Sequence, residues 1–531
     1  MNQEQRPDRS GAGGPSRGGA PRSSGGRGGS SAPRSGQPDA GVRRGGARRG
    51  GSDRGGAGID PARLAAADTL QAVTESDAYA NLVLPGLLRE RGLVGRDAAF
   101  ATELTYGTLR MRGRYDAIIE RCTRGRSLAE VDPPLLDLLR LGCHQLLATR
   151  VPPHAAVSQT VDLVRTRLGQ GAAGFANAVL RAVGRRDQDA WLAEITAGAT
   201  DDVGRLAAAE SHPTWIVRAL RASLAAAGRP ASELPELLAA HNAAPAVTLV
   251  ARPGLVSAED LAEDVEEATG QHPEPGRWAP TALRLPVGDP AALTAVREHR
   301  AGVQDEGSQL VALALAAAPL GADPSLPAGG APTDSRWLDL CAGPGGKAAL
   351  LGALAADRDA HLVANEVAPH RARLVRQSVS ALPDGVVDVR TGDGRDLPEA
   401  EAGTFDRVLV DAPCTGLGAL RRRPESRWRR VPADVPDLTA LQRGLLDAAL
   451  AAVRPGGVVG YVTCSPHVAE TRAVVDDALK RHDVELLDAR DALTAVAGQQ
   501  VPALGDGPLV QLWPHVHGTD AMFLALLRRR S

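Results

Sequence analysis

The sequence predicts a multi-domain protein: an all-α bundle, then a small α/β unit, then a larger α/β domain with a Rossmann-like sheet. Three observations support this fold class. Apolar residues recur at i, i+3 and i+4 through the first part of the chain, as in amphipathic helices. From about residue 303, short apolar runs alternate with helical patterns. One such run, at 336–340, leads into a glycine-rich turn that opens a helix.

The overall composition is that of a soluble globular protein. The chain has 531 residues, 43% hydrophobic and 23% charged, which is enough for three or four domains with their own cores. We find neither a membrane-spanning apolar run nor a secretory signal. The five cysteines form no CxxC pair and no zinc-like spacing with histidine. We therefore expect a reduced, cytoplasmic protein without a metal, and a monomer.

Residues 1–58 consist mainly of Gly, Arg, Ser and Pro, so we expect a disordered tail that cannot bury a core. Eleven Arg against four acidic residues give the tail a charge of +7, and the whole chain has −2, which leaves −9 for the remainder. Such a tail can attract RNA phosphates regardless of sequence. A tail that serves only solubility is the alternative, and the sequence leaves both open.

The bundle is predicted at 59–205, because amphipathic segments there are joined by short turns containing Gly and Pro. A small α/β unit at 206–302 is predicted to link it to the third domain. The expected helices of the bundle are 62–74, 79–91, 96–122, 134–148, 155–168 and 173–183. The expected strands and helices of the linking unit are 246–251, 258–268, 282–285 and 291–298.

The third domain, at 303–531, is predicted to be a parallel, doubly wound sheet with a late strand pair at its edge. In such sheets ligands bind at the carboxyl ends of the strands. The expected strands are 336–340, 361–365, 386–390, 405–411 and 458–463, with weaker ones at 484–487, 509–512 and 522–526. The expected helices are 347–356, 369–381, 437–453 and 468–481.

The first three strand ends indicate a nucleotide-like cofactor. The first strand ends in the glycine loop 341–347, the second at Glu366, and the third runs into Asp393. Acids at such positions can accept hydrogen bonds from ribose hydroxyls or from the adenine amino group. The loop lacks the G-x-G-x-x-G spacing of dinucleotide sites, and Lys347 is not followed by the Ser or Thr of a P-loop. An adenosine cofactor without a pyrophosphate fits better, and S-adenosylmethionine is the common one.

The next two strand ends carry cysteines. The fourth strand leads into Asp411-Ala412-Pro413-Cys414 and the fifth into Cys464. Methyl transfer to carbon 5 of a cytosine requires covalent activation, in which a thiolate adds to C6. A strand end that faces a helix N-terminus would lower a thiol pKa. Cys414 and Cys464 both qualify by position, whereas Cys122 and Cys143 are expected to be inert and buried.

These motifs together resemble the Sun family of RNA cytosine-5 methyltransferases, and within it the enzymes of bacterial small-subunit ribosomal RNA. The resemblance covers about 60–531 and implies a class I S-adenosylmethionine-dependent methyltransferase domain. It also implies that the bundle is NusB-like and binds RNA, since the NusB antitermination fold resembles this family's N-terminal domain. The matching segments are 151–157, 175–181, 304–309, 340–347, 393–395, 411–414, 463–465 and 514–520.

The resemblance also implies roles that spacing alone left open. Cys464 would be the nucleophile that attacks C6, and Cys414 would assist product release. Three positions depart from the family pattern: Gly343 replaces an Ala, Thr471 replaces an Asn, and Ala521 stands where a Gly is usual. The implied cofactor site consists of Cys341, Ala342, Gly343, Pro344, Gly345, Gly346, Lys347, Glu366, Asp393 and Asp411.

An arginine-rich segment follows Cys414, with six Arg and one Trp at 421–430. Arginine pairs with phosphates and tryptophan can stack on a base, so RNA contact is predicted there. A solvated basic surface is the alternative. The target base would have to be flipped out or single-stranded. The predicted RNA-binding residues are Arg421, Arg422, Arg423, Arg427 and Trp428.

The leading hypothesis is S-adenosylmethionine-dependent methylation of C5 of a cytosine in 16S ribosomal RNA. Another RNA such as tRNA, or DNA, are alternative substrates. An amino-directed enzyme would place an aromatic residue after Asp/Asn-Pro-Pro, and 411–414 has none. A NusB-like ribosome-assembly factor with a vestigial catalytic domain is a further alternative. The intact cysteines and acids argue against it.

Overall fold

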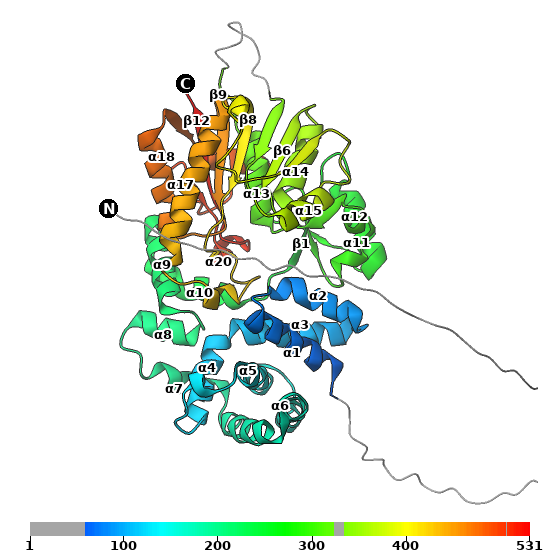
Figure 1. Ribbon diagram of the computed structural model, residues 1–531, viewed down its shortest axis with the longest axis vertical. Helices are drawn as coiled ribbons and strands as arrows, with labels where there is room; N and C mark the ends of the chain where they lie inside the picture. Colours follow the sequence, from blue (N-terminus) through cyan, green and yellow to red (C-terminus); the bar gives the residue numbers. More distant parts are fainter. Residues whose placement is uncertain (1–58, 323–333, 506, 531) are drawn as a thin grey trace, which may run out of the picture. The chain divides into compact units, whose positions relative to one another are not determined.

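Helices build the first part of the protein, where alanine and leucine recur on one side of each segment. The structure, a computed structural model, describes residues 59–322, 334–505 and 507–530, so the predicted tail at 1–58 lies outside the described residues. The helices of this part, coloured blue through cyan to green in Figure 1, are α1 (Pro61–Glu75), α2 (Ala80–Glu90), α3 (Gly95–Arg110), α4 (Arg112–Cys122), α5 (Pro133–Ala148), α6 (Pro153–Val183), α7 (Gln188–Thr196), α8 (Asp202–Ala209), α9 (Thr214–Ala226) and α10 (Leu234–Asn242).

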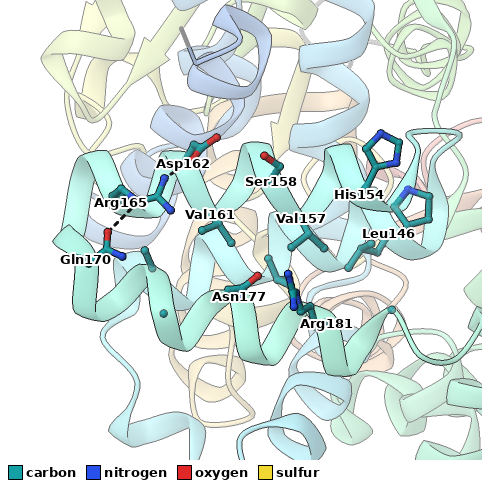
Figure 2. A pocket seen from close by; sticks show the side chains of 15 residues that line it. Leu146, His154, Val157, Ser158, Val161, Asp162, Arg165, Gln170, Asn177 and Arg181 are labelled. Atoms are coloured by element: carbon teal, nitrogen blue, oxygen red, sulfur yellow. Dashed lines mark hydrogen bonds and ion pairs between the residues drawn. The ribbon is translucent and has the colours of Figure 1, made fainter. Parts of the chain in front are cut away.

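Two helix boundaries in this region have local causes. The single helix predicted at 96–122 is divided into α3 and α4, because Met111 leaves the helical conformation with φ −97° and ψ 13°. Helix α6 contains a break at Gly169, whose φ of 86° lies in the left-handed region that favours glycine. The two halves of α6 run side by side beyond this break (Figure 2). They match the two helices that the sequence predicts.

The linking unit is built around a small antiparallel sheet of strand order β2-β3-β1-β4. Its apolar cluster joins β1, β3 and α11. Helices α8, α9 and α10 belong instead to a separate cluster with Leu417, Leu420 and Trp513, and the predicted boundary at 205 falls inside α8. The elements of the unit are β1 (Val247–Ala251), α11 (Ala258–Thr269), β2 (Glu274–Pro275), β3 (Ala282–Leu285), α12 (Thr294–Arg297) and β4 (Ala301–Val303).

The last part of the chain forms the large sheet, as the strand–helix alternation predicts. Its strands are β5 (Arg336–Asp339), β6 (His361–Glu366), β7 (Val387–Thr391), β8 (Phe405–Asp411), β9 (Val453–Thr463), β10 (Val484–Leu487), β11 (Val510–Gln511) and β12 (Phe523–Arg529). Its helices are α13 (Glu306–Ala317), α14 (Gly346–Ala356), α15 (Pro369–Ser378), α16 (Ser426–Arg429), α17 (Asp434–Ala452), α18 (Arg472–Arg481), α19 (Ala489–Ala497) and α20 (Pro514–His517).

Alternate residues of the central strands enter opposite cores, as expected of a sheet buried on both faces. Leu409 of β8 packs with α13, α14 and α19 on one face, while Val408 and Val410 pack with α17 and α18 on the other. Figure 1 shows α17 and α18, in orange, beside the strands. Strands β5 to β9 pair in parallel, and β12 pairs antiparallel with β9 and β10 at the edge.

The strand order places the functional crevice. The order is β10-β12-β9-β8-β5-β6-β7, so β5 lies between β8 and β6. The chain connects outward from β5 through β6 to β7, and then crosses to β8 on the other side of β5. A reversal of this kind opens a crevice at the carboxyl ends of the two strands that flank it. Those ends are Asp339 in β5 and Asp411 in β8.

Candidate active site

A cavity of about 370 Å³ lies at the carboxyl ends of β5, β8 and β9. The glycine loop, the loop after β8 and the residue after β9 contribute to its wall, so three of the predicted strand ends meet at one place. Arginines from the segment after Cys414 border it. The predicted site residues that line this cavity are Cys341, Ala342, Gly343, Pro344, Gly346, Lys347, Asp411, Cys414, Arg422, Arg423 and Cys464.

The two strand-end cysteines are in contact, with 3.4 Å between the Sγ atoms of Cys414 and Cys464. Backbone hydrogen bonds hold their loops together. The N–H of Ala412 donates to the carbonyl of Val462 over 2.9 Å, and the N–H of Gly418 donates to the carbonyl of Cys464, also over 2.9 Å. The pairing of β8 with β9 thus continues past both strand ends and fixes one thiol against the other.

The surroundings of the two thiols differ in charge. A hydrogen bond from Cys414 lowers the pKa of Cys464; burial and Asp411 oppose this, while Lys347 and Arg423 favour the thiolate. The hydrogen bond to Cys464 and burial raise the pKa of Cys414 well above its usual value. The first proton that the pair loses is therefore that of Cys464, and Cys414 then donates the hydrogen bond between them.

Lys347 is the cation of the glycine loop, and its Nζ donates to Oδ2 of Asp411 over 2.9 Å. Burial by itself lowers the pKa of Lys347, but the attraction of Asp411 and this hydrogen bond outweigh burial and raise it. Lys347 therefore remains charged. It joins the end of β8 to the start of α14 and supplies positive charge beside Cys464.

Asp339 is a site residue that the sequence-based reasoning missed. It is 1% exposed, lines the cavity, and has no hydrogen-bond partner of ordinary geometry for either carboxylate oxygen in the described part of the chain. Burial and the negative charge of Asp411 raise the pKa of Asp339 to about 7. The available signal was an acid between apolar residues near the end of the strand, since 336–340 reads RWLDL.

Lys347 and the backbone N–H of Cys341 favour the charged form of Asp339 but do not outweigh burial and Asp411. A buried carboxylate at the cavity wall without a hydrogen bond of ordinary geometry fits a cationic ligand, because its burial costs free energy. S-adenosylmethionine carries a sulfonium and an ammonium group, so Asp339 supplies what such a ligand requires. The glycine loop, which opens α14 at Gly346, adds backbone N–H groups at a helix N-terminus. The residues present at this cavity therefore fit the predicted cofactor.

Three predicted cofactor residues, Gly345, Glu366 and Asp393, do not line the cavity. Glu366 is buried and accepts hydrogen bonds from the N–H groups of Gly343 at 3.0 Å and Ala368 at 2.9 Å. Asp393 forms an ion pair with Arg395, and that hydrogen bond lowers the pKa of Asp393 to about 2. In this structure their carboxylates are occupied by the protein itself.

The structure gives a steric reason for a glycine, and not an alanine, at position 343. A Cβ atom at this position would lie 2.2 Å from Oε2 of Glu366, closer than any real contact. The alanine usual in the resembling family would require the Glu366 carboxylate to move. Gly345, which likewise does not line the cavity, has φ 113° and lies against Val375 and Ser378, so it serves the turn into α14.

The structure places part of the predicted RNA-binding set inside the protein. Arg427 is fully buried, and its guanidinium donates to the carbonyls of Arg110, Ser211 and His241 and to the side chain of Asn242. These acceptors lie at the C-terminal ends of α3 and α10 and beside the end of α8, where unpaired carbonyls favour a cation. Arg427 thus fastens the arginine-rich segment to the helical region and is not available to RNA.

Arg421 is also used inside the protein. Its guanidinium forms ion pairs with Asp305 at 2.7 Å and Asp520 at 3.0 Å, and it is 9% exposed. Arg422 pairs with Asp520 as well, but its side chain is 40% exposed and borders the cavity. Both arginines are therefore paired with buried carboxylates that are distant in the sequence, and the sequence alone does not indicate this pairing.

The other aromatic and basic residues of the segment lie closer to the surface. Trp428 is half-buried, with the guanidinium of Arg112 5.7 Å from its ring centre. Arg423 is exposed, borders the cavity, and lies over the ring of Tyr79 at 5.2 Å. Of the five predicted residues, Arg422 and Arg423 are the ones placed both at the cavity and toward solvent.

A second cavity, of about 580 Å³, lies in the helical region between the two halves of α6. Figure 2 shows His154, Ser158, Asn177 and Arg181 around this space, with Val157 and Val161 on the helix between them. No cysteine lines it.

Among the described residues we find no group of three or more His, Cys, Asp and Glu that could hold a metal ion. The helices of the described residues also include none with the length and apolar character of a membrane span.

Comparisons with known proteins assign these features to a class. A family model described as "16S rRNA methyltransferase RsmB/F" matches residues 331–528, and one described as "NusB family" matches residues 60–185. The protein is therefore a methyltransferase whose Rossmann-like domain follows a NusB-like helical region. This confirms the fold class that the sequence predicts.

Relatives along most of the chain identify the family. The chain is 54% identical over 472 residues to "Putative methyltransferase Rv1407" of Mycobacterium tuberculosis, covering 89% of this chain and 97% of that protein. It is 30% identical over 475 residues to "Ribosomal RNA small subunit methyltransferase B" of Erwinia tasmaniensis, covering 88% and 98%. The chain belongs to the RsmB/F methyltransferase family, as the sequence motifs predicted.

A solved structure shares the fold over the same extent. The structure titled "Crystal Structure of PH0851" superposes with a TM-score of 0.72 and 20% sequence identity, covering 89% of this chain and 99% of that one. The similarity supports the arrangement of the helical region, the small sheet and the large sheet in one chain.

Proposed function

We propose that this protein uses S-adenosylmethionine to methylate C5 of a cytosine in small-subunit, 16S ribosomal RNA. One observation carries the proposal: two thiols 3.4 Å apart share a cavity with the glycine loop and an unpartnered buried carboxylate. A methyl donor needs the loop and the carboxylate, whereas an unreactive carbon acceptor needs a thiolate. Cytosine C5 is an acceptor that requires both.

The cofactor would be held by the glycine loop and by Asp339, and when bound it supplies an electrophilic methyl group. Lys347 and Asp411 border the same space and are paired with one another. Glu366 supports the loop from behind through the N–H of Gly343. Asp393 reaches a bound ligand only by giving up its ion pair with Arg395.

Cys464 acts as the nucleophile. Its thiolate adds to C6 of the cytosine, forming a carbon–sulfur bond and moving the electrons of the C5–C6 double bond so that C5 becomes nucleophilic. C5 would then take up the methyl group, while the bond between that methyl and the donor's sulfonium sulfur would break and leave its electron pair on sulfur as a neutral thioether. The proton on C5 leaves to a base, its electron pair restores the double bond, and the C6–sulfur bond breaks to return the thiolate. Asp411, at the cavity, would help to position the cytosine.

Cys414 assists the last step. Because its sulfur lies 3.4 Å from that of Cys464 and it holds its proton, it can donate a hydrogen bond to the departing thiolate. Without that donor, the carbon–sulfur bond would break more slowly than it forms. This division of roles follows the resemblance to the Sun family and agrees with the charges around the two thiols.

Ribosomal RNA is proposed as the substrate from the family description and from the printed name of the Erwinia relative. Arg422 and Arg423 border the cavity and suit contact with phosphates of a flipped-out or single-stranded cytosine. The NusB-like region and the arginine-rich tail are proposed to add RNA affinity.

Bisulfite sequencing of ribosomal RNA from cells lacking the gene, and from cells complemented with Cys464→Ala, tests the proposal. We expect one cytosine to lose its methyl group in both strains and to regain it with the wild-type gene. A methylated site in the Cys464→Ala strain would refute the nucleophile. Unchanged ribosomal RNA together with a lost methyl group in tRNA would refute the substrate.

A further inference from the structure

A carboxylate with no role in the proposed mechanism lies directly behind the two thiols. Glu470 is fully buried in the short turn that follows β9. No cation forms an ion pair with it among the residues that the structure describes. A buried carboxylate without a cation persists only if hydrogen bonds satisfy its oxygens. Its partners therefore indicate what it holds in place.

Those partners come from both cysteine loops. Oε1 of Glu470 accepts from the backbone N–H of Thr415 over 2.8 Å, and Oε2 accepts from the hydroxyl of the same residue. Oε2 also accepts from the hydroxyl of Ser465 over 2.7 Å. Thr415 follows Cys414 in the chain, and Ser465 follows Cys464. One carboxylate thus holds the neighbours of both reactive thiols.

The same carboxylate is anchored to the scaffold. The side-chain amide of Gln442, on α17, donates to Oε1 of Glu470 over 3.2 Å and to the carbonyl of Pro413 over 2.8 Å. The hydroxyl of Tyr461, on β9, donates to the backbone carbonyl of Glu470 over 2.7 Å. A helix and a strand of the core therefore fix the position from which Glu470 holds the loops.

We propose that Glu470 is a positioning residue that clamps the loops of Cys414 and Cys464 so that the two sulfurs remain in contact with different protonation states. The inference rests on the proposed function, because it assigns Glu470 a part in dividing the work between those thiols. Glu470 touches neither the RNA nor the methyl donor. It acts through Thr415 and Ser465.

The distribution of charge supports the clamp. Glu470 lies on the side of Cys414, where its negative charge helps to raise the pKa of that thiol. Lys347 and Arg423 act on Cys464 and favour its thiolate. The negative charge near the sulfur of Cys414 and the positive charges near the sulfur of Cys464 favour the proton on Cys414 and the thiolate on Cys464. Neutralising Glu470 removes the negative charge that helps to keep the proton on Cys414.

The geometry predicts which substitutions fail. Glutamine preserves the size of Glu470 but removes its charge, and an NH₂ group in place of Oε2 would force the hydroxyls of Thr415 and Ser465 to accept instead of donate, so the network must rearrange. Aspartate keeps the charge but is one methylene shorter, so it cannot reach Thr415 and Ser465 together. Thr415→Ser keeps the hydroxyl that the clamp uses, whereas Thr415→Val removes it.

The test compares Glu470→Gln with Glu401→Gln in the full-length protein. Glu401 is also buried in the large-sheet domain, but it pairs with Arg336 and Arg390 beside the start of β8, at the opposite end of the strands. Both variants lose one buried carboxylate. Four quantities are measured: kcat and KM on ribosomal RNA, the thermal unfolding midpoint, and the ratio of iodoacetamide alkylation at Cys464 to that at Cys414.

We expect Glu470→Gln to lower kcat by about 10- to 100-fold, the range for a small displacement of reacting groups, with KM changed only a few-fold. Cys464 should be alkylated faster than Cys414 in the wild type, and the ratio should fall toward equality in Glu470→Gln. Glu401→Gln should retain the wild-type ratio and kcat. Thr415→Ser should retain activity, and Thr415→Val should lose part of it.

A wild-type kcat in Glu470→Gln would overturn the inference. So would a reduced kcat with an unchanged alkylation ratio, since that combination means that Glu470 supports only the stability of the domain. Failure of the proposed function gives a different result: Cys464→Ala would remain active. The alkylation ratio needs no RNA, so it reports on the clamp even in that case.

Discussion

Asp339→Asn is predicted to make the protein more stable at alkaline pH and less able to bind its methyl donor. The Asp339 carboxylate is 1% exposed and has no hydrogen-bond partner of ordinary geometry in the described structure. Burial and the charge of Asp411 raise its pKa from 3.8 to about 7. Ionised Asp339 is therefore a destabilising group that the native fold retains.

The raised pKa gives the size and the sign of the effect. At about 1.4 kcal/mol per pH unit, a rise of about three units corresponds to about 4 kcal/mol. Between about pH 4 and pH 7 the native state binds this proton and the unfolded state does not, so the free energy of unfolding falls as pH rises. Above pH 7 the full cost is present. An asparagine avoids it but buries an unpaired amide at about 1–3 kcal/mol, which leaves a net gain of about 1–3 kcal/mol.

Urea unfolding of wild type and Asp339→Asn, followed by tryptophan fluorescence at about pH 5 and about pH 8, measures this difference. The variant should gain stability at pH 8 and little or none at pH 5. Asp334→Asn is the matched control at the opposite end of β5. Burial acts to raise the pKa of Asp334, but hydrogen bonding and attraction from Arg407 lower it overall, so its loss should destabilise at pH 8.

Calorimetric titration with S-adenosylmethionine should show weaker binding to Asp339→Asn, because the neutral side chain no longer attracts a cationic ligand. The reasoning would be refuted if Asp339→Asn lowered the free energy of unfolding at pH 8 by as much as it does at pH 5. It would mean that the carboxylate has a partner in the ligand-free protein.

Further predictions concern the thiols, the cation beside them and RNA binding. Cys414→Ala should accumulate a covalent enzyme–RNA adduct on a denaturing gel, and its absence would remove the role in release. Lys347→Met should move the rising limb of the pH–rate profile to higher pH, because Lys347 lowers the pKa of Cys464. Arg423→Ala should weaken RNA binding in a filter assay without changing the unfolding midpoint, whereas Arg427→Ala should lower that midpoint, since it removes the donor to three buried backbone carbonyls and to the side chain of Asn242. Deleting residues 1–58 should preserve kcat and weaken RNA binding mainly at low salt; an inactive truncation would contradict this.

The positions where strands end were predictable because periodicity changes there, and this was enough to direct attention to Cys414 and Cys464. That their sulfurs touch was not predictable from either segment, since it depends on β8 and β9 being neighbours. The order of strands follows from how whole helices cover the sheet. No local pattern encodes it.

Charged residues were predicted less well than apolar ones. The sequence 421–430 indicates positive charge but not which arginines meet buried acceptors, and Arg427 meets helix ends contributed by segments almost two hundred residues away or more. Similarly, Glu366 and Asp393 lie at or after strand ends, where the sequence predicts them. Their carboxylates, however, bind the N–H of Gly343 and the side chain of Arg395. Long-range partners decide where a charged side chain points.

The burial of Arg427 and of the cluster around Leu417, Leu420 and Trp513 limits how this protein can be divided. The two family models leave a gap between residues 185 and 331, and helices α8, α9 and α10, which pack against Leu417, Leu420 and Trp513, lie inside that gap. A fragment cut to the boundaries of the methyltransferase model would expose apolar side chains and an arginine that the fold keeps dry. Such a fragment would tend to aggregate, so the intervening helices and the catalytic sheet have to be expressed together as one folding unit.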